Sequence, residues 1–355
     1  MDVNKVLVMA GGTGGHVFPA LSIAKELKLN NVEILWLGTR GRMEEMLVPK
    51  YGFNIKYIDV KGIRRNGIMA LLKAPFMILK SVMQARKIIK EFKPDVVLGM
   101  GGYASGPGGV AAFLSGVPVV LHEQNAAAGM TNKLLFKIAK RVMLGFPGAF
   151  EGQKVTVVGN PVRNSILSLH DEVRDYSREK LRISIVGGSL GARALNELIP
   201  LALTKFDDSI EVIHQCGKGN AQKVEPLYKD AKFSVECKDF VDDMDKLYKD
   251  SDLIICRAGA LTVAETCAAA LPAIFVPLPT AVDDHQTKNA MFLKDAGAAL
   301  LFKQSELDAD KLYQAIKNLN DNRELLKQMS KASFKCATID ATQKAVAIID
   351  DAFNN

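Results

Sequence analysis

The 355-residue sequence is poor in cysteine: it has five, at scattered positions, and no C-x-x-C pair. This spacing excludes a disulfide-rich scaffold and does not match the ligand spacing of a structural zinc site. We therefore expect the protein to work in a reducing cytoplasm. The first residues also lack the basic start, long apolar core and cleavage site of a signal peptide, so no export is expected.

The sequence also lacks an uninterrupted apolar run long enough to span a membrane. Residues 96–121 carry no charge, but seven glycines and two prolines interrupt them. About 20 apolar residues are needed to cross a bilayer. The interruptions instead predict a buried strand, a Gly-rich loop, a short helix and a second strand. With 48% hydrophobic and 24% charged residues, the composition is that of a folded globular protein.

Acidic residues are absent between Lys61 and Lys90, where eight Lys and Arg are mixed with Ile, Leu, Met and Phe. The first 163 residues have 22 Lys and Arg against 10 Asp and Glu, whereas the remainder has 24 against 29. Apolar side chains ringed by cations are typical of a peripheral contact with an anionic membrane, although part of this apolar set must be ordinary core. Nucleic-acid binding is not expected, because interleaved aromatics and a recognition motif are missing.

The length exceeds the roughly 250–300 residues at which single cores stop growing, so two domains are expected. Short β-branched runs alternate with helical stretches, which predicts an α/β fold of two Rossmann-like, doubly wound parallel-sheet domains with a cleft between them. A charged, Ser-rich segment at residues 165–180 is expected to be a linker. The expected strands are 5–9, 32–37, 55–58, 96–100, 119–122, 155–158, 182–186, 211–215, 233–236, 253–256, 273–276 and 299–301.

Three Gly-rich turns directly follow expected strands. Such turns let a ligand approach the backbone, and the helix that follows offers free N–H groups to phosphate oxygens, although glycine also serves close packing alone. None fits the dinucleotide fingerprint or the P-loop pattern, so nicotinamide, flavin and P-loop NTPase chemistry are not expected. Phosphate-bearing ligands are expected on both domains. The turns are Gly11–His16, Gly101–Gly108 and Gly187–Ala192.

Polar side chains gather after the expected strands. His16 ends the first turn, where an imidazole can take a proton from a hydroxyl; alternatively it only hydrogen-bonds the loop or a phosphate. His122–Asn125 is expected to contact substrate. In the second half, the small residues of Arg257–Glu265 allow a diphosphate to approach. Glu265 could accept from ribose hydroxyls or lie on a solvated helix face.

Two D-x-D patterns, Asp243-Met244-Asp245 and Asp308-Ala309-Asp310, could formally chelate a divalent metal. Both precede helical runs, and helix capping explains them better. No metal and no cofactor is therefore expected.

Several motifs together resemble the MurG family, bacterial UDP-N-acetylglucosamine transferases with a GT-B fold. The resemblance spans nearly the whole chain. It implies that the N-terminal domain (1–162) binds acceptor and membrane and that the C-terminal domain (163–335) binds the nucleotide sugar. Residues 336–355 would form a helix that packs back on the first domain. The motifs are 11–20, 99–108, 122–125, 159–163, 187–189 and 259–265.

The resemblance also implies roles for individual residues. His16 is the candidate base, and Gly102, Tyr103, Ser105 and Gly106 are candidates for the acceptor diphosphate. This chain differs from the family at three positions: Leu190 and His285 stand where the family often has Gln, and Ala264 stands where it often has Ser. These differences are expected to affect the affinity for the donor. The residues implied in donor binding are Thr13, Gly14, Gly15, Asn125, Arg163, Ser189, Val241, Ala260, Leu261, Thr262, Val263, Ala264, Glu265 and Gln286.

The implied reaction is an inverting, metal-independent transfer of N-acetylglucosamine from its UDP ester to lipid I, giving lipid II. The expected partners are UDP-N-acetylglucosamine, lipid I, the anionic inner-membrane surface through Lys61–Lys90 and, as a possibility, proteins of cell-wall synthesis. The expected location is peripheral, on the cytoplasmic face of that membrane. Two alternatives stay open: a non-hydrolysing UDP-sugar epimerase of the same fold, and a non-catalytic basic adaptor for membrane or nucleic acid.

Overall fold

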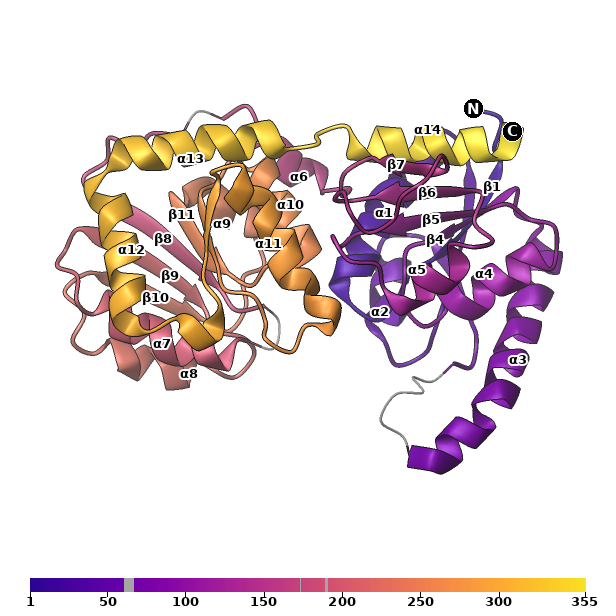
Figure 1. Cartoon of the computed structure of the whole chain (residues 1–355), viewed down its shortest axis with the longest axis horizontal. Helices are drawn as coiled ribbons and strands as arrows, with labels where there is room; N and C mark the ends of the chain where they lie inside the picture. The colour runs from indigo at the N-terminus through magenta and orange to yellow at the C-terminus, as the bar shows by residue number, and fades with distance from the viewer. Residues whose placement is uncertain (61–66, 173, 189–190) are drawn as a thin grey trace. The chain divides into compact units, whose positions relative to one another are not determined.

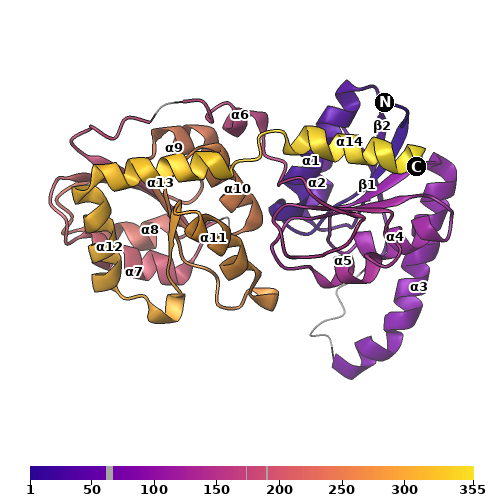
Figure 2. The same ribbon diagram turned by 45° about the horizontal axis from the view of Figure 1, so that its top comes forward.

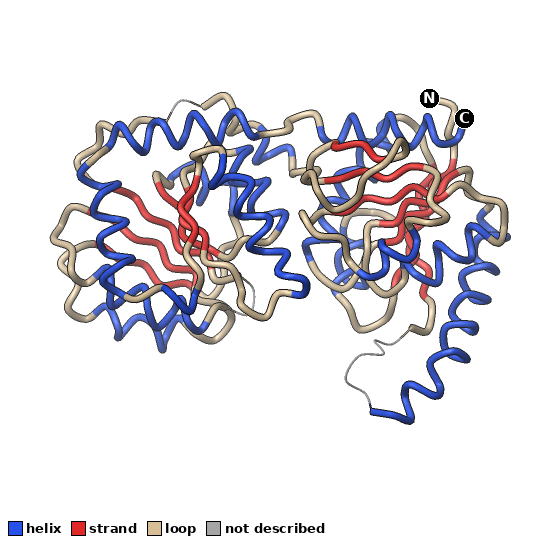
Figure 3. The backbone as a smooth tube through the Cα atoms, in the orientation of Figure 1, coloured by secondary structure: helices blue, strands red, loops and turns tan. Residues whose placement is uncertain are grey.

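The computed structural model describes residues 1–60, 67–172, 174–188 and 191–355, and the side chains of residues 67–74 lie outside this description. The chain divides into two compact units (Figure 1). Unit 1 comprises Met1–Arg163 and Ile339–Asn355, and unit 2 comprises Asn164–Thr338. Figure 3 shows one sheet in each unit, with helices on both of its faces.

The sheet of unit 1 has seven strands in the order β3-β2-β1-β4-β5-β6-β7, and all their pairings are parallel. One of them, β6, was not predicted, because its apolar run is only three residues long and follows Lys140-Arg141. The strands are β1 (Lys5–Met9), β2 (Glu33–Gly38), β3 (Asn54–Tyr57), β4 (Val96–Gly99), β5 (Val119–Glu123), β6 (Arg141–Leu144) and β7 (Val155–Val157).

Side-chain alternation along β1 explains why helices cover both faces of this sheet. Val6 and Val8 lie in a core with α1 and α14, whereas Leu7 and Met9 lie in a core with α3, α4 and α5. The helices of the unit are α1 (Gly14–Leu29), α2 (Met43–Lys50), α3 (Gly67–Phe92), α4 (Ser105–Phe113), α5 (Met130–Leu135) and α14 (Ala341–Asn354).

The last helix of the chain, α14, packs against α1 in unit 1, near the chain's first residues (Figure 2). The Asp350 carboxylate accepts from the backbone N–H groups of Asp2 and Val3, at 2.8 and 3.1 Å. Arg141 Nε lies 2.8 Å from Asp351 Oδ2. The Asp350 bonds join the two ends of the chain, and the Arg141–Asp351 pair joins α14 to β6.

Unit 2 repeats the pattern with six parallel strands in the order β10-β9-β8-β11-β12-β13. The elements in chain order are α6 (Asn164–Leu167), β8 (Leu181–Val186), α7 (Arg193–Leu203), β9 (Ile210–Gln215), α8 (Ala221–Val224), β10 (Ser234–Lys238), α9 (Met244–Asp250), β11 (Leu253–Cys256), α10 (Ala260–Ala268), β12 (Ala273–Phe275), α11 (His285–Asp295), β13 (Ala299–Leu301), α12 (Ala309–Asp321) and α13 (Arg323–Cys336), with short 3₁₀ turns at Glu225–Tyr228, Val282–Asp284 and Gln304–Glu306.

The expectation that residues 165–180 form a linker is wrong. Tyr176 is buried in the main core of unit 2. Arg174 donates hydrogen bonds to the backbone carbonyls of Tyr248 and Ala269, at 2.9 and 2.7 Å. The prediction failed because the buried residues of this segment do not follow a helical or strand period. The segment is held instead by partners far away in the sequence, which no local pattern reveals.

Candidate active site

Two Gly-rich turns of unit 1 touch each other at the carboxyl ends of β1 and β4. Gly102 has φ of +91°, and a Cβ placed on it would lie 2.4 Å from the backbone oxygen of Gly11. Only glycine fits both this backbone conformation and this close approach. Parallel strands end at one edge of the sheet, so the turns that follow them form a common surface there.

We expect Gly102→Ala to destabilise unit 1 by about 2–4 kcal/mol, because a left-handed backbone and a clash with Gly11 add together. Gly116→Ala is the matched control: its φ is +73°, and no atom lies within 4 Å of the position that its Cβ would take. That variant should lose about 1–2 kcal/mol. Urea unfolding of both proteins measures the difference, and equal losses would contradict the close contact between the turns.

A buried carboxylate holds the first Gly-rich turn. Glu44 is 1% exposed and accepts from the backbone N–H of Gly12 at 2.9 Å and from the Thr39 hydroxyl at 2.8 Å. The expectation that this turn binds phosphate therefore needs a correction at the Gly12 amide alone. The Gly12 amide already donates to a carboxylate, and that negative charge disfavours a phosphate at the same amide.

His16 stands in the first turn of α1 and faces the loop that follows β5. Its Nδ1 lies 2.9 Å from Oε1 of Gln124. The ring also packs against Gly101, where a Cβ would lie only 2.9 Å from Cε1 of the imidazole. No described residue hydrogen-bonds Nε2 of His16, so this nitrogen is the one that can meet a ligand.

The expectation that all of His122–Asn125 contacts substrate is wrong for the first three residues. His122, Glu123 and Gln124 are between 0% and 2% exposed and bond to protein groups. The Glu123 carboxylate accepts from the backbone N–H groups of Asn125 and Gly129, at 3.1 and 2.9 Å. Asn125 alone is partly exposed. The sequence located the cluster but did not separate the side chains that organise the loop from the one that can reach a ligand.

The residues predicted for the acceptor diphosphate have different surroundings. Ser105 is fully buried, and its hydroxyl donates to the backbone oxygens of Met9 and Gly101, at 2.9 and 2.7 Å. Its side chain therefore organises the turn, and only its backbone remains as a candidate contact. Tyr103 is exposed, with the Arg42 guanidinium 5.2 Å from its ring centroid. Gly102 precedes Tyr103 in the turn, and Gly106 is the second residue of α4.

Four further candidates of unit 1 lie near His16 in the chain or in space. Thr13 is the N-cap residue of α1, without a side-chain capping bond, and Gly14 and Gly15 form its first turn. Arg163 lies with its guanidinium 5.9 Å from the ring centroid of Phe18, one turn further along the same helix. Unit 1 thus gathers its predicted residues around one helix N-terminus.

In unit 2, most of the predicted donor residues lie on α10, directly after β11. Gly259 is the N-cap residue, and the backbone N–H of Val263 makes the first helical bond, to its oxygen. The backbone N–H groups of Ala260 to Thr262, in the first turn of α10, have no acceptor within the helix and can therefore donate to a ligand. Glu265 is 6% exposed and accepts from the Tyr248 hydroxyl at 3.1 Å. The alternative of a solvated helix face for Glu265 is therefore wrong.

The remaining donor candidates of unit 2 stand on neighbouring loops. Gln286 accepts from the backbone N–H of Leu278 at 2.9 Å, which turns its amide oxygen toward the protein. Val241 is partly exposed in the loop after β10. Ser189 and Leu190 lie outside the described residues. The adjoining Gly188 is held by Gln215, whose side chain accepts from its N–H at 2.9 Å and donates to its oxygen at 3.0 Å.

A pocket of about 550 Å³ opens at this edge of unit 2, beside the Gly-rich turn after β8. It is lined in part by Arg257, Thr280 and Gln304, which were not among the predicted site residues. Arg257 donates to Gln304 Oε1 at 2.7 Å and to the backbone oxygen of Val276 at 2.8 Å. The sequence places Arg257 at the start of the stretch expected to meet a diphosphate, but it assigns the Arg257 side chain no role.

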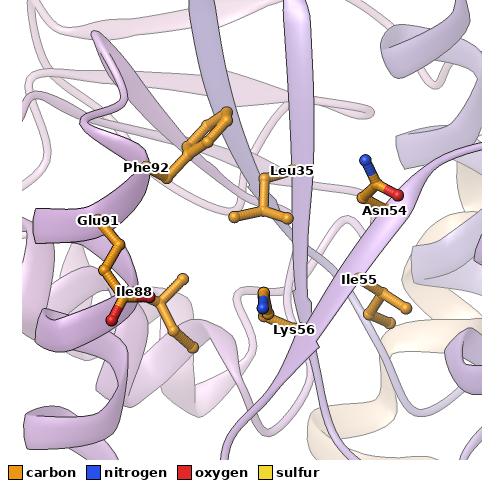
Figure 4. A pocket seen from close by; sticks show the side chains of 7 residues that line it. All are labelled: Leu35, Asn54, Ile55, Lys56, Ile88, Glu91 and Phe92. Carbon is orange, nitrogen blue, oxygen red and sulfur yellow. The ribbon is translucent and has the colours of Figure 1, made fainter.

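A second pocket, of about 520 Å³, lies away from the Gly-rich turns, between β2, β3 and the end of α3 (Figure 4). It contains none of the predicted site residues. Its lining is Leu35, Asn54, Ile55, Lys56, Ile88, Glu91 and Phe92.

The two D-x-D patterns cap helices, as predicted. Asp243 accepts from the backbone N–H of Lys246 at 2.9 Å, and Asp308 accepts from that of Lys311 at 2.8 Å. Within the described ranges, no group of three or more His, Cys, Asp or Glu side chains is placed to hold a metal ion.

Two doubly wound parallel sheets with Gly-rich turns at their carboxyl ends define a class that includes GT-B glycosyltransferases and epimerases of the same fold. The chain matches the glycosyltransferase family 28 N-terminal domain over residues 6–144 and the family 28 C-terminal domain over residues 182–349. It therefore belongs to glycosyltransferase family 28, and the expected GT-B fold and the resemblance to the MurG family are confirmed.

Individual proteins agree with this assignment. The chain is 54% identical over 340 residues to a UDP-N-acetylglucosamine–N-acetylmuramyl-(pentapeptide) pyrophosphoryl-undecaprenol N-acetylglucosamine transferase from Aeromonas hydrophila, covering 96% of this chain and 94% of the relative. The crystal structure of Acinetobacter baumannii MurG is similar with a TM-score of 0.84 and 43% identity, covering 98% and 99%. A UDP-N-acetylglucosamine 2-epimerase, at 16% identity and a TM-score of 0.67 over 97% and 94%, shares the fold alone.

Proposed function

We propose that this protein transfers N-acetylglucosamine from UDP-N-acetylglucosamine to the C4 hydroxyl of undecaprenyl-diphosphoryl-N-acetylmuramoyl-pentapeptide (lipid I), giving lipid II. The observation that carries the proposal is the 54% identity to a relative named for this transfer, over 96% of the chain. The epimerase alternative has less support, because its likeness is limited to the fold.

In the proposed reaction, His16 is the general base. The acceptor C4 oxygen attacks the anomeric carbon of the donor while its proton moves to Nε2 of His16. The bond between the anomeric carbon and the diphosphate oxygen breaks, and UDP leaves with that electron pair. One displacement inverts the anomeric configuration and needs no covalent glycosyl-enzyme. The support in unit 1 is the position of His16 at the sheet edge, with Nδ1 bound by Gln124.

Unit 2 would bind the donor. The first-turn N–H groups of α10 and the helix dipole would stabilise the diphosphate as negative charge develops on it. Glu265 would accept from ribose hydroxyls; the support is its carboxylate on α10, which already accepts from the Tyr248 hydroxyl. Gln286 keeps its NH₂ group for the sugar, because its oxygen accepts from Leu278. Ser189 and Val241 would complete this site.

Release of UDP tests the proposed function. The purified protein is mixed with UDP-N-acetylglucosamine, with and without a lipid I analogue, and UDP-N-acetylgalactosamine serves as the control donor. We expect release that depends on the acceptor and is confined to the gluco donor. Turnover of the donor without acceptor would contradict the transferase and favour the epimerase.

The same proposal includes peripheral binding to an anionic membrane through α3. Its described part exposes Phe76, Leu79 and Met83 at 77%, 59% and 64%, next to the cations Lys80 and Arg86. Packed against it, α4 exposes further large apolar side chains. Lys61–Arg65 lie outside the described residues. No helix in the part of the chain that the structure describes is both long and apolar enough to cross a bilayer.

Leu79→Glu tests this surface. It removes the burial of one leucine in the lipid and adds a charge that an anionic surface repels, so binding to phosphatidylglycerol vesicles should fall about 10-fold or more. Leu201→Glu on α7 of unit 2 is the matched control, since Leu201 is 58% exposed. Vesicle co-sedimentation measures both. If the two variants bound equally well, the α3 surface would not be the membrane contact.

A further inference from the structure

The buried side chains behind His16 form a chain of hydrogen bonds whose direction can be worked out from one fixed point. His122 is fully buried, and its Nε2 lies 3.0 Å from the backbone oxygen of Gly159. A carbonyl oxygen only accepts, so Nε2 carries the proton. Burial lowers the pKa of His122 to about 4, so the ring is neutral near pH 7. Its Nδ1 is then an acceptor.

The orientation of the Gln124 amide follows from this. One end of the amide lies 3.2 Å from Nδ1 of His122 and 3.2 Å from the backbone oxygen of the same residue. Both atoms are acceptors, so this end must be the NH₂ group. The other end is the carbonyl oxygen, 2.9 Å from Nδ1 of His16. His16 therefore donates from Nδ1, and in its neutral form Nε2 carries the free lone pair.

We infer that Gln124 is a positioning residue that sets the tautomer of His16, and that His122 sets the orientation of Gln124 in turn. The inference rests on the proposed function, in which His16 is the base. Gly159 and Asn160 complete the arrangement, since Asn160 also donates to the backbone oxygen of Gln124 at 3.0 Å. The loop of Gly159 and Asn160 thus holds both His122 and the backbone of Gln124.

This arrangement has a consequence for the proton transfer. When Nε2 of His16 takes the acceptor proton, the imidazolium keeps its Nδ1–H bond to the Gln124 oxygen, which stabilises the positive charge. The Asn of Cys-His-Asn proteases orients its histidine in the same way. Without the Gln124 oxygen, both tautomers of His16 are populated and the ring loses its fixed orientation. The fraction with a proton on Nε2 cannot act as a base there.

The test uses the full-length protein labelled with ¹⁵N in its five histidine rings. In the wild type we expect the ring spectrum of His16 near pH 7.5 to show a protonated Nδ1 and an unprotonated Nε2. Gln124→Met, which keeps the length but removes the hydrogen bonds to His16 and His122, should convert His16 to a mixture of tautomers. It should also lower kcat about 10–100-fold while KM for the donor stays within about 3-fold. Gln314→Met, on the exposed face of α12, is the control and should change neither readout.

A second variant guards against a folding defect. Gln124→Glu keeps an acceptor for Nδ1 of His16 but places a carboxylate against Nδ1 of His122. We expect His122 to become protonated on both ring nitrogens in this variant, while His16 keeps its Nδ1–H tautomer. Thermal unfolding reports whether each variant is folded.

The outcomes separate this inference from the proposed function. A wild-type His16 protonated on Nε2, or an unchanged tautomer in folded Gln124→Met, would overturn the relay whatever the activity. If the spectra behave as expected, the relay stands even where His16→Ala retains full transferase activity, and only the role of His16 as base is lost.

Discussion

Replacing His16 with alanine should lower kcat about 10²–10⁴-fold, the range that a positioned general base contributes. Donor affinity should remain within about 2-fold, because the proposed diphosphate and ribose contacts of unit 2 are untouched. The physical reason is the geometry: Nδ1 of His16 is bound by Gln124, and Nε2 is the ring nitrogen left for the acceptor hydroxyl. Steady-state kinetics with a lipid I analogue, together with calorimetric donor titration, measure the two effects.

His16→Gln separates the loss of a base from the loss of a side chain. It retains a polar group of similar length but cannot take up a proton near neutral pH. We expect it to be as slow as the alanine variant. A glutamine variant with the wild-type rate would rule out His16 as the base.

Acidification should destabilise the fold through two buried histidines. Burial lowers the pKa of His122 and of His214 to about 4, below the ordinary 6.5. Between these values the unfolded chain binds more protons than the folded chain, so stability is present above pH 6.5 and is lost as pH falls toward 4. From pH 7 to pH 5 we expect a loss of about 2 kcal/mol for each histidine and about 4 kcal/mol for both. Urea unfolding at the two pH values measures it.

His214→Gln isolates one of these contributions. The His214 ring is hydrogen-bonded to the Tyr228 hydroxyl and the Asn196 amide oxygen, at 2.9 and 3.2 Å, so the variant should be less stable at pH 7. Its pH dependence should nevertheless be flatter, with about half of the wild-type loss. A His214 variant with the wild-type slope would show that His214 does not titrate on unfolding.

The strand pattern of the sequence predicted most of the fold. Runs such as 253–256 are short, apolar and β-branched, and they end at Gly-rich turns. The residues of the run and of the turn that follows are therefore enough to predict a strand. The strand at Arg141–Leu144 was missed because its pattern is too short to distinguish from a helix end. The segment that holds Arg174 was read as a linker because its hydrogen bonds go to residues about 75 to 95 positions away.

The sequence predicted where the candidate site residues lie in the fold, but it did not predict which way their side chains point. Residues after neighbouring parallel strands meet at one edge, which is why His16 and the loop of Gln124 were both located. Which side chains turn inward depends on tertiary contacts. Ser105 bonds to backbone oxygens and Glu123 to backbone N–H groups, and no spacing in the sequence distinguishes these from ligand contacts.

The linkage of the product tests the central claim most directly. The protein is incubated with lipid I analogue and ¹³C-labelled UDP-N-acetylglucosamine, and the glycolipid product is analysed by NMR. A single displacement on the α-linked donor, with His16 as base, predicts one β-linked N-acetylglucosamine on the C4 oxygen of N-acetylmuramic acid. An α-linked product, a sugar on another oxygen, or an epimerised donor without glycolipid would contradict the account.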